Sequence, residues 1–115
     1  MKGPSDSDLT RDAFLGGDLY LWQPRAGYRA GLDPVLLAAS VEASAGQRVL
    51  ELGCGVGTAI LCLNSRVSGL HLTGVEAHTP TAELAKRNGG DALEVVTGDL
   101  AALPLALRQR QFDHV

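Results

Sequence analysis

The sequence predicts an α/β fold in which strands and helices alternate to build a parallel sheet. Three observations predict it. Apolar runs at 49–52, 70–76 and 93–97 alternate with stretches of helical spacing, which is the pattern of βαβ units with right-handed crossovers. A glycine-rich turn follows the first run, and an acidic residue stands near the end of each. We therefore expect the first half of an open parallel sheet, preceded by an N-terminal hairpin and helix.

Length and composition limit the protein to one folded domain. The chain has 115 residues, of which 45% are hydrophobic and 20% charged, and these values are typical of globular proteins. The net charge of −3 gives no overall attraction to nucleic acid, although a local basic face would suffice. Cys54 and Cys62 form no disulfide framework, and the histidines have no metal-ligand spacing with them. No apolar run approaches a membrane span and no signal-peptide core is present, so we expect a cytoplasmic protein without metal or membrane contact.

The N-terminal third predicts a flexible end, a hairpin and a helix. Residues 1–9 are rich in Gly, Pro, Ser and Asp and are assigned to a flexible terminus, with the domain covering 10–115. Two short runs at 13–15 and 18–22 flank Gly16-Gly17 and predict a β-hairpin that ends at Pro24, with Leu19 and Leu21 on one face. Asp33-Pro34 has the form of an N-cap followed by a first-turn proline. The helix that follows, over 35–43, is apolar on most faces and is expected to lie in the core.

The central stretch predicts a strand, a tight glycine turn and the start of a helix. The apolar run ending at Leu52 is followed by glycine at positions 53, 55 and 57, and helical spacing begins after Thr58. Glycine is needed where the backbone has positive φ or where a ligand approaches closely. The N-terminus of the next helix offers unpaired N–H groups to an anionic group. A nucleotide-type cofactor is therefore the leading hypothesis.

Two further βα units follow the same logic. A strand over 70–76 leads to Thr79-Pro80, which predicts a cap and a helix that continues to Asn88 and ends at Gly89-Gly90. The run 93–97 predicts the third strand. One or two helical turns are expected over 104–110, and Phe112 begins a fourth strand.

Three carboxylates lie where the strands end, and these ends meet at one crevice of an open sheet. Glu51 lies inside the end of the first strand, Glu76 closes the second and Asp99 follows the third. Glu76 comes 19 residues after Gly57, close to the ~20 expected of the acid that accepts hydrogen bonds from ribose hydroxyls. Asp99 lies beyond the ribose, where the exocyclic amino group of adenine can donate to it.

The loop sequence favours one cofactor over another. The dinucleotide fingerprint requires a small residue at position 58, where this chain has Thr58. Glu51 would repel a pyrophosphate and would suit a ligand that carries an ammonium or sulfonium group. The pattern therefore favours S-adenosyl-L-methionine, and an NAD-dependent oxidoreductase is the weaker alternative.

Motifs along most of the chain carry a family resemblance. The stretch Glu51-Leu-Gly-Cys-Gly-Val-Gly57 resembles the first motif of class I methyltransferases, which implies a Rossmann-like fold. The wider set resembles bacterial tRNA adenine-N6 methyltransferases, which are grouped with the release-factor glutamine methyltransferases. That set is Asp12-Ala-Phe-Leu-Gly-Gly17, Gln23-Pro24, Gly27-Tyr-Arg-Ala-Gly-Leu-Asp-Pro-Val-Leu-Leu-Ala38, Gly74-Val-Glu76, Gly98-Asp99-Leu100 and Phe112-Asp113.

The resemblance implies roles for particular residues. Glu51 would approach the methionyl ammonium through water, and the backbone of 53–57 would face the methionine and ribose. Glu76 would hold the ribose hydroxyls. The segment 28–33 would close over the methionine end, with a helix N-cap as the other reading of Asp33. Ala77 would lie beside the adenine, and Asp99 and Leu100 would read its edge. The predicted cofactor-binding set is Asp33, Glu51, Leu52, Gly53, Cys54, Gly55, Gly57, Glu76, Ala77, Asp99 and Leu100; no catalytic residue and no metal ligand is assigned.

One family motif is absent from the 115 residues. The family carries Asn-Pro-Pro-Tyr or Asn-Pro-Pro-Phe after the fourth strand, and neither asparagine here, Asn64 or Asn88, precedes a proline. We therefore expect the N-terminal part of a class I methyltransferase domain, truncated at the fourth strand and inactive by itself. An exposed sheet edge at that point would favour self-association.

The predicted function follows from these expectations. It is methyl transfer from S-adenosylmethionine to an amino nitrogen of adenine, with tRNA as a partner of the full-length parent. The alternatives are a non-catalytic cofactor-binding fragment and methylation of a protein glutamine amide.

Overall fold

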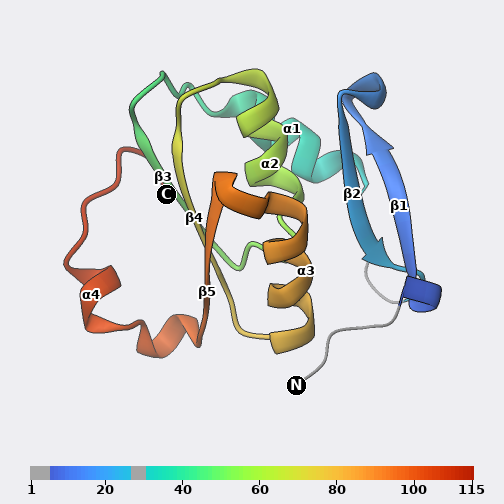
Figure 1. Cartoon of the computed structure of the whole chain (residues 1–115). Helices are drawn as coiled ribbons and strands as arrows, with labels where there is room; N and C mark the ends of the chain where they lie inside the picture. Colours follow the sequence, from blue (N-terminus) through green and yellow to red (C-terminus); the bar gives the residue numbers. More distant parts are fainter. Residues whose placement is uncertain (1–5, 27–30) are drawn as a thin grey trace.

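The computed structural model describes residues 6–26 and 31–115, and it contains two sheets (Figure 1). An antiparallel hairpin pairs β1 (Leu9–Phe14) with β2 (Leu19–Pro24). A parallel sheet has the order β3 (Arg48–Leu52), β4 (His71–Glu76), β5 (Leu93–Thr97). The α-helices are α1 (Leu32–Ser40), α2 (Thr58–Arg66), α3 (Thr79–Gly89) and α4 (Leu105–Arg108).

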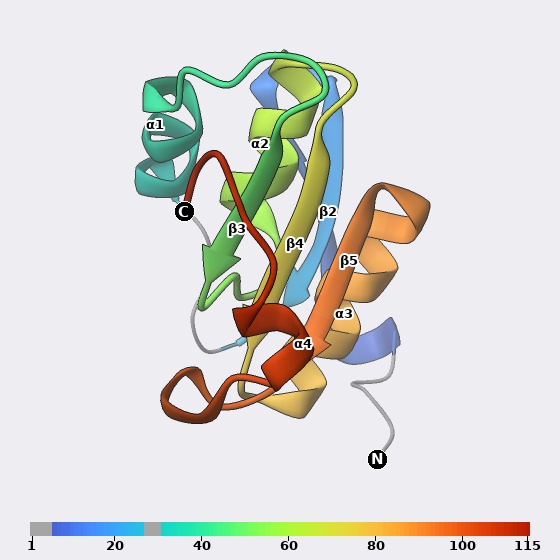
Figure 2. The ribbon, with the colours of Figure 1, turned by 90° about the vertical axis from the view of Figure 1, so that its left-hand side faces the viewer.

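The elements stack in layers, and this arrangement confirms the predicted α/β fold with a parallel sheet. Figure 1 shows the hairpin beside α2 and α3, which cover one face of the sheet, and Figure 2 shows α4 over the other face. Successive strand residues point to opposite faces. Val49 and Leu72 accordingly belong to the main core with α2, whereas Leu50 and Val75 pack with Leu107 of α4 in a smaller second core.

Helix α2 lies at the centre of the main core. Every residue from Thr58 to Leu63 is buried. The reason is that α2 has neighbours on several sides, since it packs between the sheet, α1 and the hairpin. This burial fixes the point at which the glycine turn enters the helix.

Two predictions for α1 are wrong. The helix begins one residue before Asp33, so the N-cap is Gly31 and Asp33 lies in the first turn. It is also not a core helix, because it packs mainly against α2 on one side; only Ala38 is buried, whereas Leu32 and Leu36 are 68% and 55% exposed. The guanidinium of Arg66 donates to the carbonyl oxygens at the C-terminal end of α1, including that of Ala38 at 3.1 Å.

Among the described residues, regular structure begins at Asp6, inside the terminus 1–9 that the sequence assigned as flexible. Asp6–Asp8 form a 3₁₀ turn and Leu9 opens β1 with only 3% of its surface exposed. Main-chain and side-chain groups of Arg25 hold this end: its N–H donates to the Asp8 carbonyl at 2.7 Å and its Nη2 to the Leu9 carbonyl at 3.2 Å. The hairpin and the shared face of Leu19 and Leu21 are confirmed. Residues 1–5 and 27–30 lie outside the described residues, and the second range includes the first half, 28–30, of the predicted closing segment 28–33.

The remaining predicted elements occur close to their predicted positions. Helix α3 begins at Thr79, so Pro80 takes the second position and His78, one residue before the predicted cap, precedes the helix. The predicted fourth strand is reduced to a single parallel bridge between Val49 and His114. It is fastened by the Leu50 N–H to the His114 carbonyl at 2.9 Å and lies beside β3, on the side away from β4.

The turn after β3 lies directly on β4, and Gly74 makes this approach possible. A Cβ at position 74 would lie 2.7 Å from Sγ and 2.9 Å from Cβ of Cys54, closer than packed atoms come. Glycine at this strand position therefore lets the turn after β3 pack directly against β4.

The substitution Gly74→Ala tests this approach. We expect it to lower the free energy of unfolding by roughly 1–3 kcal/mol, because the added methyl overpacks a buried contact. Urea denaturation measures the change. Gly98→Ala is the matched control, since a Cβ there meets nothing within 4 Å; its effect should stay within about 0.5 kcal/mol. Adding Gly74→Ala to a Cys54→Gly variant should be less destabilising than adding it to the wild type, and an equal effect in both would contradict the proposed clash.

Candidate functional site

The glycine turn between β3 and α2 has the backbone that its sequence predicted. Gly53, Gly55 and Gly57 have φ angles of 75°, 60° and 94°, a left-handed region that favours glycine. The turn therefore places consecutive main-chain groups at the carboxyl edge of the sheet and leads directly into the buried N-terminus of α2.

Hydrogen bonds from β4 fix the position of this turn. The N–H groups of Gly53 and Cys54 both donate to the Val75 carbonyl, at 2.8 and 2.9 Å. The carboxylate of Glu76 accepts from the Gly55 N–H through one oxygen and from the His78 N–H through the other, both at 3.0 Å. Glu76 therefore joins the turn after β3 to the turn after β4.

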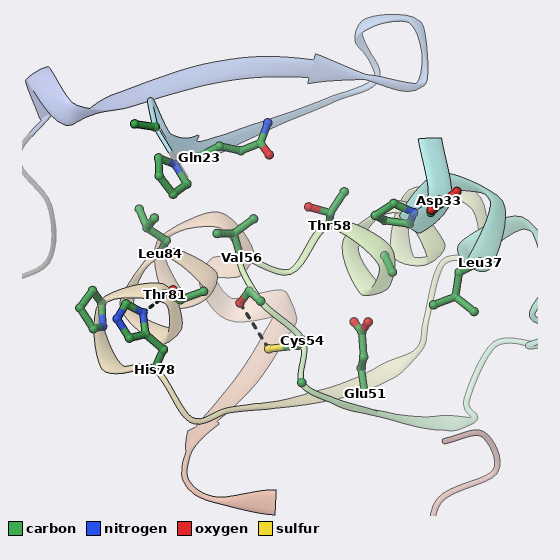
Figure 3. A pocket seen from close by; sticks show the side chains of 17 residues that line it. Gln23, Asp33, Leu37, Glu51, Cys54, Val56, Thr58, His78, Thr81 and Leu84 are labelled. Carbon is green, nitrogen blue, oxygen red and sulfur yellow. Dashed lines mark hydrogen bonds between the residues drawn. The ribbon is translucent and has the colours of Figure 1, made fainter. Parts of the chain in front are cut away.

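A pocket of about 650 Å³ opens above this turn (Figure 3). Four segments form its walls: the end of β2, the first turns of α1, the glycine turn with the start of α2, and the N-terminal half of α3. The residues that line it are Gln23, Pro24, Ala26, Asp33, Pro34, Leu37, Glu51, Gly53, Cys54, Gly55, Val56, Thr58, Ala59, His78, Pro80, Thr81 and Leu84.

Glu51 is the polar group that distinguishes one end of this pocket. Its side chain rises from β3 into the cavity, toward Thr58 (Figure 3). Its Oε1 is buried and has no hydrogen-bond partner among the described residues. Burial raises the pKa of Glu51 to about 7, against the smaller opposing effect of the Ile60 backbone N–H in the first turn of α2.

The two ends of the pocket differ in chemistry. Asp33, on the first turn of α1, lines the same side as Glu51, so two carboxyl groups face this end. At the other end His78 Nδ1 and Thr81 Oγ1 lie 2.7 Å apart in a hydrogen bond, near the apolar side chains of Pro80 and Leu84. The cavity therefore suits an elongated ligand with a cationic group at one end and an apolar body with hydrogen-bonding groups at the other.

Cys54 lines the pocket but is not an activated nucleophile. Burial, together with the nearby charges of Glu51 and Glu76, raises the pKa of its thiol to about 12. Its Sγ lies 3.6 Å from the Gly55 carbonyl oxygen. The thiol therefore stays protonated at neutral pH and acts as a small packing group, since the thiolate is the nucleophilic form.

The structure brings some of the predicted site residues together and leaves others outside the pocket. Those that line it are Asp33, Glu51, Gly53, Cys54 and Gly55; those that do not are Leu52, Gly57, Glu76, Ala77, Asp99 and Leu100. Glu76 lies next to the pocket, because its carboxylate accepts a hydrogen bond from the N–H of Gly55, which lines the pocket. Asp99 is exposed and its carboxylate accepts from the Ala101 N–H at 2.9 Å, as the cap of a 3₁₀ turn. Cofactor contacts at all eleven positions remain predictions.

Sequence reasoning did not select several residues that line the pocket. Thr58 follows the glycine turn directly and His78 comes two residues after Glu76, so both could have been found from their spacing to the motifs. Gln23 belongs to the Gln23-Pro24 motif of the family resemblance, which assigned it no role, and Leu84 carries no signal; both reach the pocket through the packing of the hairpin and α3. Among the described residues, no cluster of His, Cys, Asp and Glu could hold a metal ion. None of the helices in that part of the chain has the length and apolarity needed to cross a membrane.

Comparison with known proteins defines the class of this chain. Residues 49–115 match the family described as methyltransferase domain. This match covers more than half of the chain, and the chain therefore belongs to the family of class I, S-adenosylmethionine-dependent methyltransferase domains. No curated protein matches the sequence.

Solved structures share the fold. The tRNA (uracil-54, C5)-methyltransferase of Pyrococcus abyssi, in complex with S-adenosyl-L-homocysteine, has a TM-score of 0.67 at 20% identity, over 92% of this chain and 26% of its own. TYW2 of P. horikoshii, in complex with MeSAdo, has a TM-score of 0.68 at 16% identity. The match covers 88% of this chain and 40% of TYW2. A predicted O-methyltransferase from Agrobacterium tumefaciens has a TM-score of 0.56 at 27% identity. The match covers 64% of this chain and 39% of that protein.

These matches confirm the predicted Rossmann-like fold and, at the level of the family, S-adenosyl-L-methionine as the cofactor. The chain spans about a quarter to two fifths of the length of these three structures. The narrower resemblance to tRNA adenine-N6 methyltransferases stays a prediction.

The pKa of Glu51 predicts how stability depends on pH. It is about 7 in the folded protein against an ordinary value of 4.5, so the folded state binds more protons between these values. The free energy of unfolding should therefore fall as pH rises from 4.5 to 7, by about 3 kcal/mol at most. Glu51→Gln should flatten this decline and be more stable than the wild type at pH 8, as measured by urea denaturation across pH 5–8. Substitution of the exposed Glu42 by Gln is the control and should keep the wild-type slope; an unchanged slope in Glu51→Gln would contradict the assignment.

Proposed function

We propose that this chain binds S-adenosylmethionine in the pocket above the glycine turn and forms the cofactor-binding part of a methyltransferase that modifies an amino nitrogen of adenine in tRNA. The observation that carries the first half of this proposal is the buried Oε1 of Glu51, which faces the pocket without a partner. A buried carboxylate of this kind is costly unless a cation or donor accompanies it. The ammonium of the cofactor supplies both.

The geometry supports one orientation of the cofactor. The ammonium lies at the end formed by Glu51 and Asp33, and the adenosine extends toward His78 and Thr81. Glu76 retains acceptor capacity for a ribose hydroxyl, because each of its oxygens accepts one hydrogen bond from the described residues and a carboxylate oxygen can accept two. S-adenosylmethionine supplies an electrophilic methyl group on its sulfonium. The residues of this chain hold and orient the donor, which is a proximity effect.

The acceptor is inferred from the motif resemblance. Adenine in tRNA is favoured because the matching motifs extend from Asp12 to Asp113, well beyond the glycine turn. Methylation of a protein glutamine amide is the second candidate, since the same motifs are grouped with enzymes of that class. A cofactor-binding module without turnover is the third.

Binding of S-adenosylhomocysteine, which keeps the ammonium, tests the cofactor proposal. An ammonium beside Glu51 favours the ionised carboxyl group, so binding at pH 7, where a group of pKa about 7 is half protonated, should release up to about half a proton per ligand. Calorimetry in buffers of different ionisation enthalpy measures this release. Glu51→Gln should abolish it and weaken the affinity about 10- to 100-fold, the range of a hydrogen bond to a charged group.

Methylthioadenosine is the matched ligand control, because it lacks the ammonium and carboxylate. Its affinity should be the same for the wild type and Glu51→Gln. Binding of NAD without binding of S-adenosylhomocysteine would refute the proposal. If Glu51→Gln weakened the affinity for S-adenosylhomocysteine and for methylthioadenosine equally, Glu51 would not contact the ammonium.

Methyl transfer from labelled S-adenosylmethionine separates the three acceptor hypotheses when it is measured with a chain that carries the Asn-Pro-Pro-aromatic motif, since the 115 residues lack that motif and are expected to be inactive by themselves. Bulk tRNA and a glutamine-containing peptide are offered in parallel, and the modified nucleoside or amide is identified by mass spectrometry. Label on N6 of adenine supports the tRNA proposal. Label on the peptide amide would favour the second candidate, and cofactor binding without transfer to either would favour the non-catalytic module.

A further inference from the structure

Asn88 connects three parts of the fold that are far apart in sequence. It lies near the C-terminal end of α3 and its amide makes three hydrogen bonds to main-chain groups. Oδ1 accepts from the Trp22 N–H at 2.7 Å, and Nδ2 donates to the Trp22 carbonyl at 3.0 Å and to the Val56 carbonyl at 2.8 Å. Trp22 is 66 residues away and Val56 is 32 residues away.

The chemistry of the primary amide suits this position. An asparagine side chain has two N–H donors and one carbonyl acceptor, and here it uses both donors and the acceptor. Its two hydrogen bonds with the main chain of Trp22, one accepted and one donated, are the same pair that a residue of a neighbouring strand would form with β2. The amide therefore covers the outer edge of the hairpin at this residue, in place of another strand.

The two segments that Asn88 joins are opposite walls of the pocket. Trp22 directly precedes Gln23 and Pro24, which line the pocket from β2, and Val56 lines it from the glycine turn. Asn88 does not line the pocket itself. Its bonds set the position of the hairpin wall relative to the glycine turn, so they influence the width of the space between them.

A second contact holds the side chain of Trp22. The guanidinium of Arg87 lies 4.1 Å from the centre of the Trp22 ring, in a cation–π arrangement. Consecutive residues of α3 thus hold both the main chain and the ring of Trp22. Because Trp22 is the only tryptophan in the chain, its fluorescence reports on this junction.

We propose that Asn88 is a positioning residue for the cofactor, which fastens the hairpin to the glycine turn and so holds the pocket in its binding geometry before the ligand arrives. The affinity effect rests on the proposed function, because it requires that the pocket bind S-adenosylmethionine. The fastening itself does not. A preorganised pocket avoids the free-energy loss of ordering its walls on binding.

The experiment compares Asn88→Ala and Asn88→Asp with the wild type. Asn88→Ala removes all three hydrogen bonds. Asn88→Asp keeps the shape and the acceptor for the Trp22 N–H, but its second oxygen would face the carbonyl groups of Trp22 and Val56. Asn64→Ala on α2 is the matched control, since among the described residues the Asn64 amide makes no hydrogen bond to the hairpin or to the glycine turn.

Three measurements are made on protein that urea denaturation shows to be folded. Both Asn88 variants should bind S-adenosylhomocysteine about tenfold more weakly, the effect of losing one to two net hydrogen bonds. Amide exchange at Trp22 in the ligand-free protein should be faster in Asn88→Ala and less affected in Asn88→Asp, which keeps that acceptor. The Trp22 emission should shift in both variants, and Asn64→Ala should match the wild type in all three measurements.

Each failure has a separate meaning. If the wild type does not bind S-adenosylhomocysteine, the proposed function fails, and amide exchange at Trp22 still decides whether Asn88 fastens the hairpin. If the amide exchange rate at Trp22 and the Trp22 emission are the same in Asn88→Ala as in the wild type, the proposal that Asn88 holds the hairpin to the glycine turn is refuted. If exchange at Trp22 rises while the affinity of both variants is unchanged, the role in cofactor binding is refuted. If Asn88→Ala does not fold, Asn88→Asp decides through its Trp22 emission and its affinity for S-adenosylhomocysteine, and values equal to those of the wild type in both would refute the proposal.

Discussion

The Val75 carbonyl is the point on which the site depends. It accepts hydrogen bonds from the N–H groups of both Gly53 and Cys54, so the chain that leaves β3 is held against β4 before it turns into α2. Gly74 allows this approach because any Cβ there would overlap Cys54. Once the turn is fixed in this way, the direction of Glu51 and the starting point of α2 follow from it.

Glu51 shows how a carboxyl group can be held in a buried position at an energetic cost. Its carboxyl group lies between a buried strand and a buried helix start, where water cannot solvate it fully, and its pKa is raised to about 7 for that reason. A glutamine or an apolar side chain would be more stable at this place in the ligand-free protein. The unpartnered Oε1 is consistent with a group whose partner is the ligand.

The pocket also depends on parts of the chain that are not βα units. The hairpin contributes Gln23 and Pro24, and Asn88 on α3 connects that hairpin to the glycine turn. Glu76 connects the same turn to the start of α3. These polar bridges to main-chain groups supplement the apolar packing of the hairpin, because a hydrogen bond to a carbonyl or N–H fixes direction as well as distance.

The sequence by itself determined the three strands of the parallel sheet, the glycine turn and the family, because these depend on local patterns: strand runs, glycine at positions of positive φ, and acids at strand ends. It also singled out Glu51, which lines the pocket, since an acid beside a glycine turn is visible in one short stretch. Tertiary structure alone decided that α1 exposes Leu32 and Leu36, that Asp99 caps a turn outside the pocket, and that Asn88 joins two walls. Burial and bonding of these residues depend on partners that lie tens of residues away, and no local pattern records which partners meet.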